Sequence, residues 1–501
     1  MNVIKLRTIA AALSCSMVTL TVYASVLPAN QTNSQWFKDG AANVVNKSQL
    51  TTGEHAKNVI LFVGDGMGIS TLTAARILQG QQHAGHQGGE ENVLSFEHFP
   101  YTALVKTYTT NQQTPDSAGT MTAMATGVKT KAGIIAIADT SLRGNCLSSQ
   151  GNELISLVDL ANAKGLATGV VSTARLTHTT PAAAYAKSPE RNWEADSNLP
   201  AEAIANGCKD IASQLVERSS DNGLSVALGG GRSYFLPKEV IDGEGKAGKR
   251  NDGKDLTQTW LNSYTNAAYV WDKSGFDAID SSTTDHLLGL FNPSHMQYEI
   301  DRANDRGGEP SLTEMTTKAI EILKKNPNGY LLIVESGRID HGHHAGNAHR
   351  ALTDTVELSS AVQAAVAGTR SEDTLIMVTA DHSHVFTIAG YPQRGNPMLG
   401  LVHSIGGELA LASDGKPYTT LAYSNGPGAV VGVRDDLSSV DTTDKDFMQQ
   451  ALIPMSSETH AGEDISLHAL GPGAHLAQGV IEQNVIFHII NQVQQLGGTK
   501  Y

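Results

Sequence analysis

Aromatic residues, cysteines and positive charges are all scarce in this chain of 501 residues. Aromatic side chains make up 5% of it, 3 residues are cysteine, and 36 Lys plus Arg face 50 Asp plus Glu, a formal charge of −14. Three cysteines cannot build a disulfide scaffold, and an acidic chain without a basic tail is poorly suited to a scaffold role on nucleic acid. The balance indicates a soluble globular protein, in one large α/β domain or in two to three smaller ones. Its acidic excess is either spread over a solvated surface or gathered in part around metal ions.

Long apolar runs are also absent, except close to the N-terminus. Residues 1–24 combine a basic start, an apolar run from Ile9 to Val22 and the small-residue sequence Val-Tyr-Ala. This order predicts a signal peptide that is cleaved after Ala24, and the run is shorter than the roughly 20 residues of a membrane span. We therefore expect residues 25–501 to be exported, to the periplasm or the medium, without a membrane anchor.

Two cysteines remain in the mature chain, Cys146 and Cys208. A single pair in an oxidising compartment usually forms a disulfide. Metal ligation is the alternative, but neither cysteine has other soft ligands near it in the sequence. We predict a disulfide between Cys146 and Cys208.

Apolar runs of strand length alternate with helical stretches along most of the chain. The runs are continuously apolar, which is typical of strands buried on both faces of a parallel sheet, and they span 58–64, 167–172, 224–228, 330–335 and 374–379. Helical patterns cover 152–164, 201–217, 312–324 and 349–366. This alternation predicts a doubly wound α/β fold with a mostly parallel central sheet and helices on both faces. Turn residues from about 392 to 454 indicate a small insertion, not an independent domain.

Acidic residues follow three of the predicted strands at the point where each ends. Asp65 follows the first strand and Glu335 ends the fourth, while Asp381 follows the fifth. One such acid is usually a helix N-cap. Three acids at the carboxyl edge of one sheet, where ligands bind in this architecture, would repel one another unless cations held them. The pattern therefore favours a metal site, and His382 next to Asp381 would belong to it.

A second group of candidate ligands lies in the sequence Asp-His-Gly-His-His. Asp340 and His344 are four residues apart, so one helical turn places both on the same face. Mixed aspartate and histidine ligands suit zinc, whereas oxygen-only sets suit magnesium. Asp65 and Glu335 with a hydroxyl such as that of Thr180 would form an oxygen-only set. Two or more metals of different hardness are therefore expected.

Ser117 begins a predicted helix in the segment TPDSAGT, where partial positive charge favours an anion. A serine at this position is ordinarily an N-cap, and no G-x-S-x-G elbow supports triad chemistry. A metal ion would replace the missing base by stabilising the alkoxide. Arg191 offers a two-pronged donor for phosphate oxygens, although an isolated arginine is usually the partner in a surface ion pair.

Seven segments occur in the order of the successive motifs of alkaline phosphatases, and the chain resembles that family from about residue 58 to its C-terminus. The segments are FVGDGMG, TPDSAGTMTA, THTTPAAAYA, ERNWEAD, VESGRIDHGHH, VTADHSHVF and ETHAGED. The His-Gly-His-His run, the Arg-Asn-Trp context and the placement of the two cysteines resemble the animal branch. The resemblance implies hydrolysis of phosphate monoesters, of broad specificity, to alcohol and inorganic phosphate.

The resemblance also implies a role for each motif residue. Ser117, beside Asp116, is the nucleophile that becomes phosphorylated, and Arg191 holds the phosphate oxygens. Two zinc ions and one magnesium ion are implied, with these ligands: Asp340, His344 and His460 for the first zinc; Asp65, Asp381, His382 and Ser117 for the second; Asp65, Thr180 and Glu335 for magnesium.

Some implications concern residues around these ligands and the assembly. His178 and His341 match positions where enterobacterial members carry Asp and Lys, and they would contact the magnesium waters and the phosphate indirectly. Members are usually homodimers, and residues 392–454 correspond to their crown-like interface region. Animal members also hold calcium, with a carboxylate after the Phe of Gly-Leu-Phe. Here Asn292 takes that place, so calcium is not assigned, although Glu309 is available.

Two other readings of the sequence stay open. One is a phosphodiesterase or sulfatase of the same superfamily, but those enzymes use a threonine, or a modified cysteine or serine, in a different motif. The other is a zinc-storage or zinc-binding protein, in which Ser117 and Arg191 would be incidental. Metal analysis and an ester assay panel would separate the three.

Overall fold

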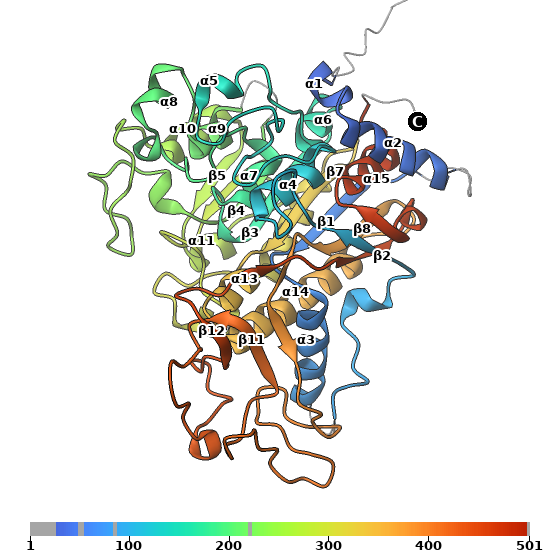
Figure 1. Ribbon diagram of the computed structural model, residues 1–501. Helices are drawn as coiled ribbons and strands as arrows, with labels where there is room; N and C mark the ends of the chain where they lie inside the picture. The colour runs from blue at the N-terminus through green and yellow to red at the C-terminus, as the bar shows by residue number, and fades with distance from the viewer. Residues whose placement is uncertain (1–26, 49–54, 84–87, 219–222, 498–501) are drawn as a thin grey trace, which may run out of the picture.

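The structure is a computed structural model that describes residues 27–48, 55–83, 88–218 and 223–497, and a ten-stranded sheet lies at its centre (Figure 1). The predicted signal peptide, residues 1–24, lies outside the described residues. The order of the strands is β15-β2-β14-β8-β1-β7-β3-β4-β6-β5. Their bounds are β1 Asn58–Gly64, β2 Tyr101–Lys106, β3 Ala167–Arg175, β4 Val226–Gly230, β5 Ala267–Val270, β6 His286–Leu290, β7 Tyr330–Ser336, β8 Thr374–Ala380, β14 Ile465–Leu470 and β15 Gly479–Glu482.

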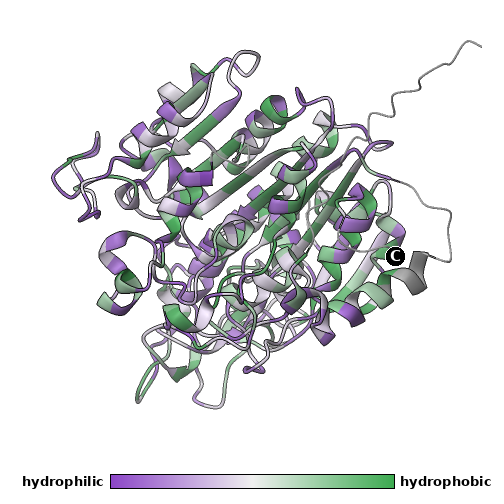
Figure 2. Ribbon diagram, turned by 90° about the horizontal axis from the view of Figure 1, so that it is seen from above, coloured by the Kyte–Doolittle hydropathy of each residue, from purple (hydrophilic) through white to green (hydrophobic). Residues whose placement is uncertain are grey.

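The strands from β8 to β5 all run parallel, and β14 runs antiparallel to both β8 and β2. Every residue of β7 and β8 is buried. Figure 2 shows these central strands as the hydrophobic interior of the molecule. The predicted doubly wound fold with a mostly parallel sheet is therefore confirmed. Strands that are covered on both faces explain the nearly continuous apolar runs in the sequence.

Helices cover both faces of the sheet (Figure 1). α12, α14 and α3 lie on one face, and α4, α6, α7 and α15 lie on the other. The helices span α1 Ala29–Thr32, α2 Gln35–Ser48, α3 Ile69–Gln82, α4 Ser117–Thr126, α5 Cys146–Ser149, α6 Leu157–Ala163, α7 Thr179–Tyr185, α8 Ala201–Ala205, α9 Ile211–Val216, α10 Leu256–Ser263, α11 Lys273–Asp277, α12 Leu312–Leu323, α13 Arg338–His344, α14 Ala348–Gly368 and α15 Val485–Gln494. Among the described residues, no helix is both long and apolar enough to cross a membrane.

Two of the predicted helices are shorter than their sequence patterns indicated. The single helix expected over 201–217 is two helices, α8 and α9. Gly207 takes a left-handed φ of 77° after α8, and the Asp210 side chain then accepts the backbone N–H of Ser213 to start α9. The helix expected from 152 begins at α6 because Ser156 caps it by accepting the N–H of Asp159. Caps decided both boundaries, and periodicity alone does not reveal them.

A separate three-stranded sheet lies beside the main one, at the lower end of Figure 1. It consists of β10 Phe386–Ile388, β11 Leu421–Gly426 and β12 Ala451–Pro454, in that order. Most of residues 392–454 lie in the loops between these strands. After β12 the chain reaches β13 (His460–Ala461), which pairs with β9 (Ser383–His384). The segment therefore leads directly into a predicted metal ligand, while its boundaries as an insertion stay a prediction.

The predicted disulfide is confirmed. Cys146 and Cys208 are bonded, and both contact a small apolar cluster with Trp193 and Ala203. The bridge joins α5 to the turn after α8. Because Trp193 belongs to this cluster, the loop that contains residues 190–193 packs beside the bridge.

Asp354 on α14 makes the stability of this fold depend on pH. Its side chain is 2% exposed, and burial raises its pKa to about 8, although its carboxylate accepts the N–H of Glu299. A pKa above the unfolded value means that the folded state binds the proton more tightly. The stabilisation is complete below the unfolded pKa, near 4, and is lost as pH rises through 8. The Asn of Asp354→Asn is neutral throughout this range.

We therefore expect the melting temperature of the metal-loaded wild type to fall, relative to that of Asp354→Asn, as pH rises from 5.5 to 8. The difference should correspond to at most about 1.4 kcal/mol per pH unit. Calorimetry of both proteins in the same buffers measures it. Parallel pH profiles would show that Asp354 is ionised in the folded protein.

Candidate active site and metal centre

The carboxyl ends of three adjacent strands bring the predicted acids together. β1 lies between β8 and β7, with Val63 level with Glu335 and Gly64 level with Ala380. Asp65 and Asp381 each follow directly, and all three carboxylates are at most 1% exposed. Burial raises the pKa of Asp65 well above its usual value, and the neighbouring carboxylates raise it further. Cations bound to these oxygens, or protons, would relieve the cost of burying so many carboxylates together.

Ser117 faces the ligand group formed by Asp65, Asp381 and His382. The ligand atoms of those three residues lie within 4.8 Å of one another. The Ser117 Oγ is 3.0 Å from His382 Nε2 and 3.4 Å from Asp65 Oδ1. Ser117 is the first residue of α4, and Asp116 caps that helix by accepting the N–H of Gly119. The structure thus places one hydroxyl at a helix N-terminus and within the same metal-capable group.

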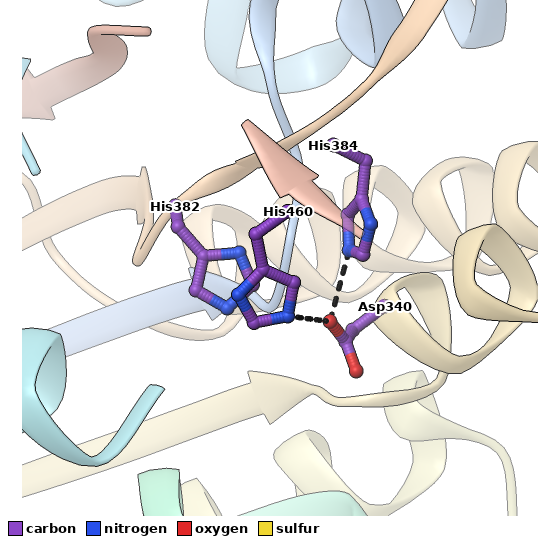
Figure 3. A group of neighbouring side chains, drawn as sticks. All are labelled: Asp340, His382, His384 and His460. Atoms are coloured by element: carbon purple, nitrogen blue, oxygen red, sulfur yellow. Dashed lines mark hydrogen bonds and ion pairs between the residues drawn. The ribbon is translucent and has the colours of Figure 1, made fainter. Parts of the chain in front are cut away.

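A second group forms around Asp340 on α13 (Figure 3). Asp340 Oδ1 lies 3.3 Å from His344 Nε2 and 3.2 Å from His460 Nε2. The other ring nitrogens contact backbone carbonyls, with His460 Nδ1 2.7 Å from the oxygen of Pro115 and His344 Nδ1 2.6 Å from that of Glu458. These contacts orient both imidazoles with Nε2 toward Asp340, an arrangement that metal-ligating histidines commonly use.

His384 is a member of this group that the sequence analysis missed. Its Nε2 lies 2.9 Å from Asp340 Oδ1, as Figure 3 shows, and its Nδ1 lies 2.6 Å from Glu458 Oε2. Burial lowers the pKa of an imidazole, but the two carboxylates outweigh it and raise that of His384 to about 9. The only sequence signal was the alternation in Asp-His-Ser-His, which by itself does not identify a partner.

A third group combines Asp65 and Glu335 with His178, and their ligand atoms lie within 4.8 Å of one another. Burial raises the pKa of Glu335 to about 7. Asp65 Oδ2, Glu335 Oε1 and Thr180 Oγ1 are buried and have no hydrogen-bond partner within the part of the chain that the structure describes. Orphaned buried oxygens on three residues of one donor set fit a bound cation. His178 thus lies next to this group, where the sequence analysis expected a contact through metal-bound water.

Arg191 contacts Asp116, the residue that caps the helix begun by Ser117. Arg191 Nη1 donates to Asp116 Oδ2 over 2.9 Å, and Nη2 donates to Thr179 Oγ1 over 3.1 Å. The backbone N–H of Gly133 also donates to Asp116 Oδ2, over 2.9 Å. Asp116 therefore fixes both α4 and the guanidinium.

His178 and His341 lie together, with ring centroids 5.5 Å apart. His295, which the sequence analysis did not single out, lies 4.0 Å from His341 by the same measure. Burial lowers the pKa of all three, and the positive charge of Arg191 lowers that of His178 further. Neutral imidazoles are therefore expected here, and those of His295 and His178 accept from nearby arginines: Arg175 lies against His295, and Arg191 Nη2 lies 3.4 Å from His178 Nε2.

The carboxylates near Asn292 have internal partners. Glu309 accepts the side-chain amide of Asn292 over 2.9 Å and the backbone N–H of Gln297 over 2.7 Å. Burial raises its pKa to about 8. Glu244 forms an ion pair with the buried Arg232. Both carboxylates therefore have partners among the described residues.

Comparisons with known proteins agree with this geometry. The family model described as "Alkaline phosphatase" matches residues 56–496. The chain is 44% identical to the tissue-nonspecific isozyme of alkaline phosphatase from Homo sapiens, over 94% of this chain and 91% of that protein, and 46% identical to the isozyme from Gallus gallus, over 95% and 92%. The solved alkaline phosphatase of Thermus thermophilus has a TM-score of 0.65 at 25% identity, covering 90% of this chain and 93% of that one.

Removing metal ions should destabilise the folded protein, because buried carboxylates such as Asp65 and Asp381 would then repel one another. We expect chelator-treated protein to melt about 5 °C or more below the metal-loaded form, and zinc to restore the difference. Asp65→Asn removes one buried charge, so its metal-free form should be at least as stable as metal-free wild type while its response to zinc is smaller. Equal melting temperatures of loaded and stripped wild type would rule out a role for cations in stability.

Proposed function

The chain belongs to the alkaline phosphatase family and hydrolyses phosphate monoesters, and we propose that it does so through a covalent phosphoserine on Ser117. The observation that carries this proposal is the position of the Ser117 Oγ, 3.0 Å from His382 Nε2 within a group of buried ligands. No general base of the serine-hydrolase type is needed if cations stabilise the alkoxide.

We further propose two zinc ions and one magnesium ion per subunit. The mixed donor sets fit zinc and the set rich in oxygen fits magnesium, as ligand chemistry requires. The residues that would hold them are Asp340, His344 and His460; Asp65, Asp381, His382 and Ser117; and Asp65, Thr180 and Glu335. When bound, the ions supply Lewis-acid stabilisation of the attacking, leaving and water oxygens.

Ser117 and Arg191 have different roles in the proposed reaction. Ser117 Oγ attacks phosphorus while the bond from phosphorus to the alcohol oxygen breaks, and the alcohol leaves with a proton. Water then cleaves the phosphoserine, which releases inorganic phosphate and restores the Ser117 hydroxyl. The place of Ser117 at the N-terminus of α4 favours the negative charge of the phosphoryl group. Arg191 binds non-bridging oxygens with the fork that Asp116 and Thr179 hold in place. Because these contacts recognise the phosphate and not the alcohol, we propose broad specificity for monoesters.

The alternative functions are weaker on this geometry. A zinc-storage protein gives no reason for Ser117 and Arg191 to converge on Asp116 and the metal-capable groups. A phosphodiesterase or sulfatase is disfavoured because the relatives that match over nine tenths of the chain are alkaline phosphatases. The disulfide supports the proposed export, since such bridges persist in oxidising compartments.

A homodimer is proposed from exposed apolar residues on the small sheet and its loops. Val431 and Val433 are each 85% exposed, and Leu452 on β12 is 79% exposed. Ile405 is 92% exposed in the same segment. A second copy of the chain is the proposed cover, because exposed apolar side chains concentrated in one segment typically mark an interaction surface and the family resemblance implies a dimer.

Ser117→Ala should retain bound zinc but lose nearly all turnover of p-nitrophenyl phosphate at alkaline pH, by about three orders of magnitude or more. The matched variant is Asp340→Asn, which should lower zinc content as well as rate. Elemental analysis and initial rates on both proteins measure this. Undiminished turnover by Ser117→Ala would exclude the nucleophile role, and unchanged zinc in Asp340→Asn would exclude that ligand.

Charge placed in the proposed interface should separate the subunits. Leu452→Asp should shift the molar mass measured by light scattering from that of two chains to that of one, because an unpaired carboxylate cannot be buried cheaply. The control is Ile241→Asp, at another exposed apolar residue, 62% exposed and outside the small sheet. A wild type that scatters as a single chain would contradict the proposal.

A further inference from the structure

We propose that the ion pair between Arg143 and Glu190 is a positioning device for Arg191, and that it sets the affinity of the site for phosphate. The inference rests on the proposed role of Arg191 as the phosphate-binding residue. Neither partner belongs to the metal-capable groups, and no role has been given above to Arg143 or to Glu190, which opens the motif segment ERNWEAD. They matter because Glu190 precedes Arg191 and also binds the backbone N–H of Asn192, which follows it.

Glu190 immediately precedes Arg191 and receives three hydrogen bonds. Arg143 donates to it with both prongs, Nε to Oε2 over 2.8 Å and Nη2 to Oε1 over 3.0 Å. The backbone N–H of Asn192 donates to Oε1 as well, over 3.1 Å. The carboxylate thus bridges the residues before and after Arg191, so that the local turn cannot open without breaking a charge-assisted pair.

Gly133 connects this ion pair to the phosphate site. A Cβ at Gly133 would lie 2.2 Å from Arg143 Cζ, so the guanidinium rests directly on this glycine. The N–H of Gly133 donates to Asp116, and its carbonyl accepts the backbone N–H of Arg191 over 2.9 Å. One glycine therefore joins the Arg143 guanidinium, the Arg191 backbone and the carboxylate that orients the Arg191 fork.

The surrounding backbone adds support on the outer side. The N–H of Gly144 donates to the carbonyl of Pro189 over 2.9 Å, and Ser188 Oγ donates to the carbonyl of Glu190 over 2.7 Å. Cys146 follows shortly after Gly144, and its disulfide with Cys208 lies in the same apolar cluster as Trp193. The loop that follows Ala138 and the loop that carries Arg191 are therefore fastened to each other at several points.

Arg143 itself is not positioned to bind substrate. Its Nε and Nη2 donors are used by Glu190, whose side chain is 16% exposed while that of Arg143 is 45% exposed. It acts through Arg191, and a pair half open to water has a modest effect. We expect a loss of phosphate affinity of roughly threefold to tenfold when the pair is broken, with a smaller change in kcat.

If Arg143 and Glu190 acted on phosphate only through their charges, the two substitutions below would have opposite effects. Arg143→Ala removes a positive charge and would weaken phosphate binding on either account. Glu190→Gln removes a negative charge, so electrostatics alone would tighten phosphate binding. If Glu190 instead positions Arg191, the same substitution would weaken phosphate binding.

The experiment measures inhibition by inorganic phosphate, together with kcat and KM for p-nitrophenyl phosphate, on the metal-loaded enzyme. Arg143→Ala and Glu190→Gln should both raise the inhibition constant by roughly threefold to tenfold, and Arg143→Lys, which cannot donate with two prongs, should fall between wild type and Arg143→Ala. Matched controls are Arg302→Ala and Glu299→Gln, which break a bidentate pair of similar exposure elsewhere and should leave the constant unchanged.

The same substitutions in an Arg191→Ala background complete the test. There, Arg143→Ala should cause no further loss, because the group it positions is missing. An equal loss in both backgrounds, or tighter phosphate binding by Glu190→Gln, would overturn the positioning role. If Arg191→Ala alone left phosphate inhibition unchanged, the premise about Arg191 would fail instead. Melting temperature and zinc content, unchanged in each variant, exclude a general loss of structure.

Discussion

The crowding of buried carboxylates at one edge of the sheet is the constraint on which the rest of the site depends. Parallel strands β1, β7 and β8 end at the same level of the sheet. Asp65, Glu335 and Asp381 therefore lie close together. Burial and mutual repulsion raise the pKa values of these groups. Only cations relieve that cost while keeping oxygens available for chemistry. A few of the chain's many acidic residues therefore form the proposed metal site.

Around the ligands, contacts to backbone and to other carboxylates fix the direction of each ring. The carbonyls of Pro115 and Glu458 set the orientation of His460 and His344, and Glu458 also binds His384. Glu458 comes from the segment that leaves the small sheet, so the proposed dimer surface and the metal centre share a stretch of chain. Geometry at the reacting atoms is thereby determined by segments hundreds of residues apart.

Arg191, the proposed phosphate-binding residue, is also oriented by contacts with its neighbours. Asp116 orients the Arg191 fork, and Gly133 links the Arg191 backbone to the Arg143 guanidinium, which lies so close that any side chain at this position would clash with it. A guanidinium is useful in catalysis only when its plane is fixed before the substrate arrives. The Arg143–Glu190 pair provides this fixation from outside the site.

The sequence by itself determined the fold class, the disulfide, and the groups around which the chemistry is built. Continuous apolar runs indicate buried parallel strands, and the carboxyl ends of such strands lie at one edge of the sheet. The sequence therefore predicted that Asp65, Glu335 and Asp381 lie together. Only the tertiary structure decided the partners of these groups. His384 with Glu458, His295 with His341, and Arg143 with Glu190 are separated by 74, 46 and 47 residues. No local period links such pairs, and the break between α8 and α9 likewise depended on a cap. Side-chain contacts over such distances arise from how loops pack, and that packing is an outcome of the whole fold.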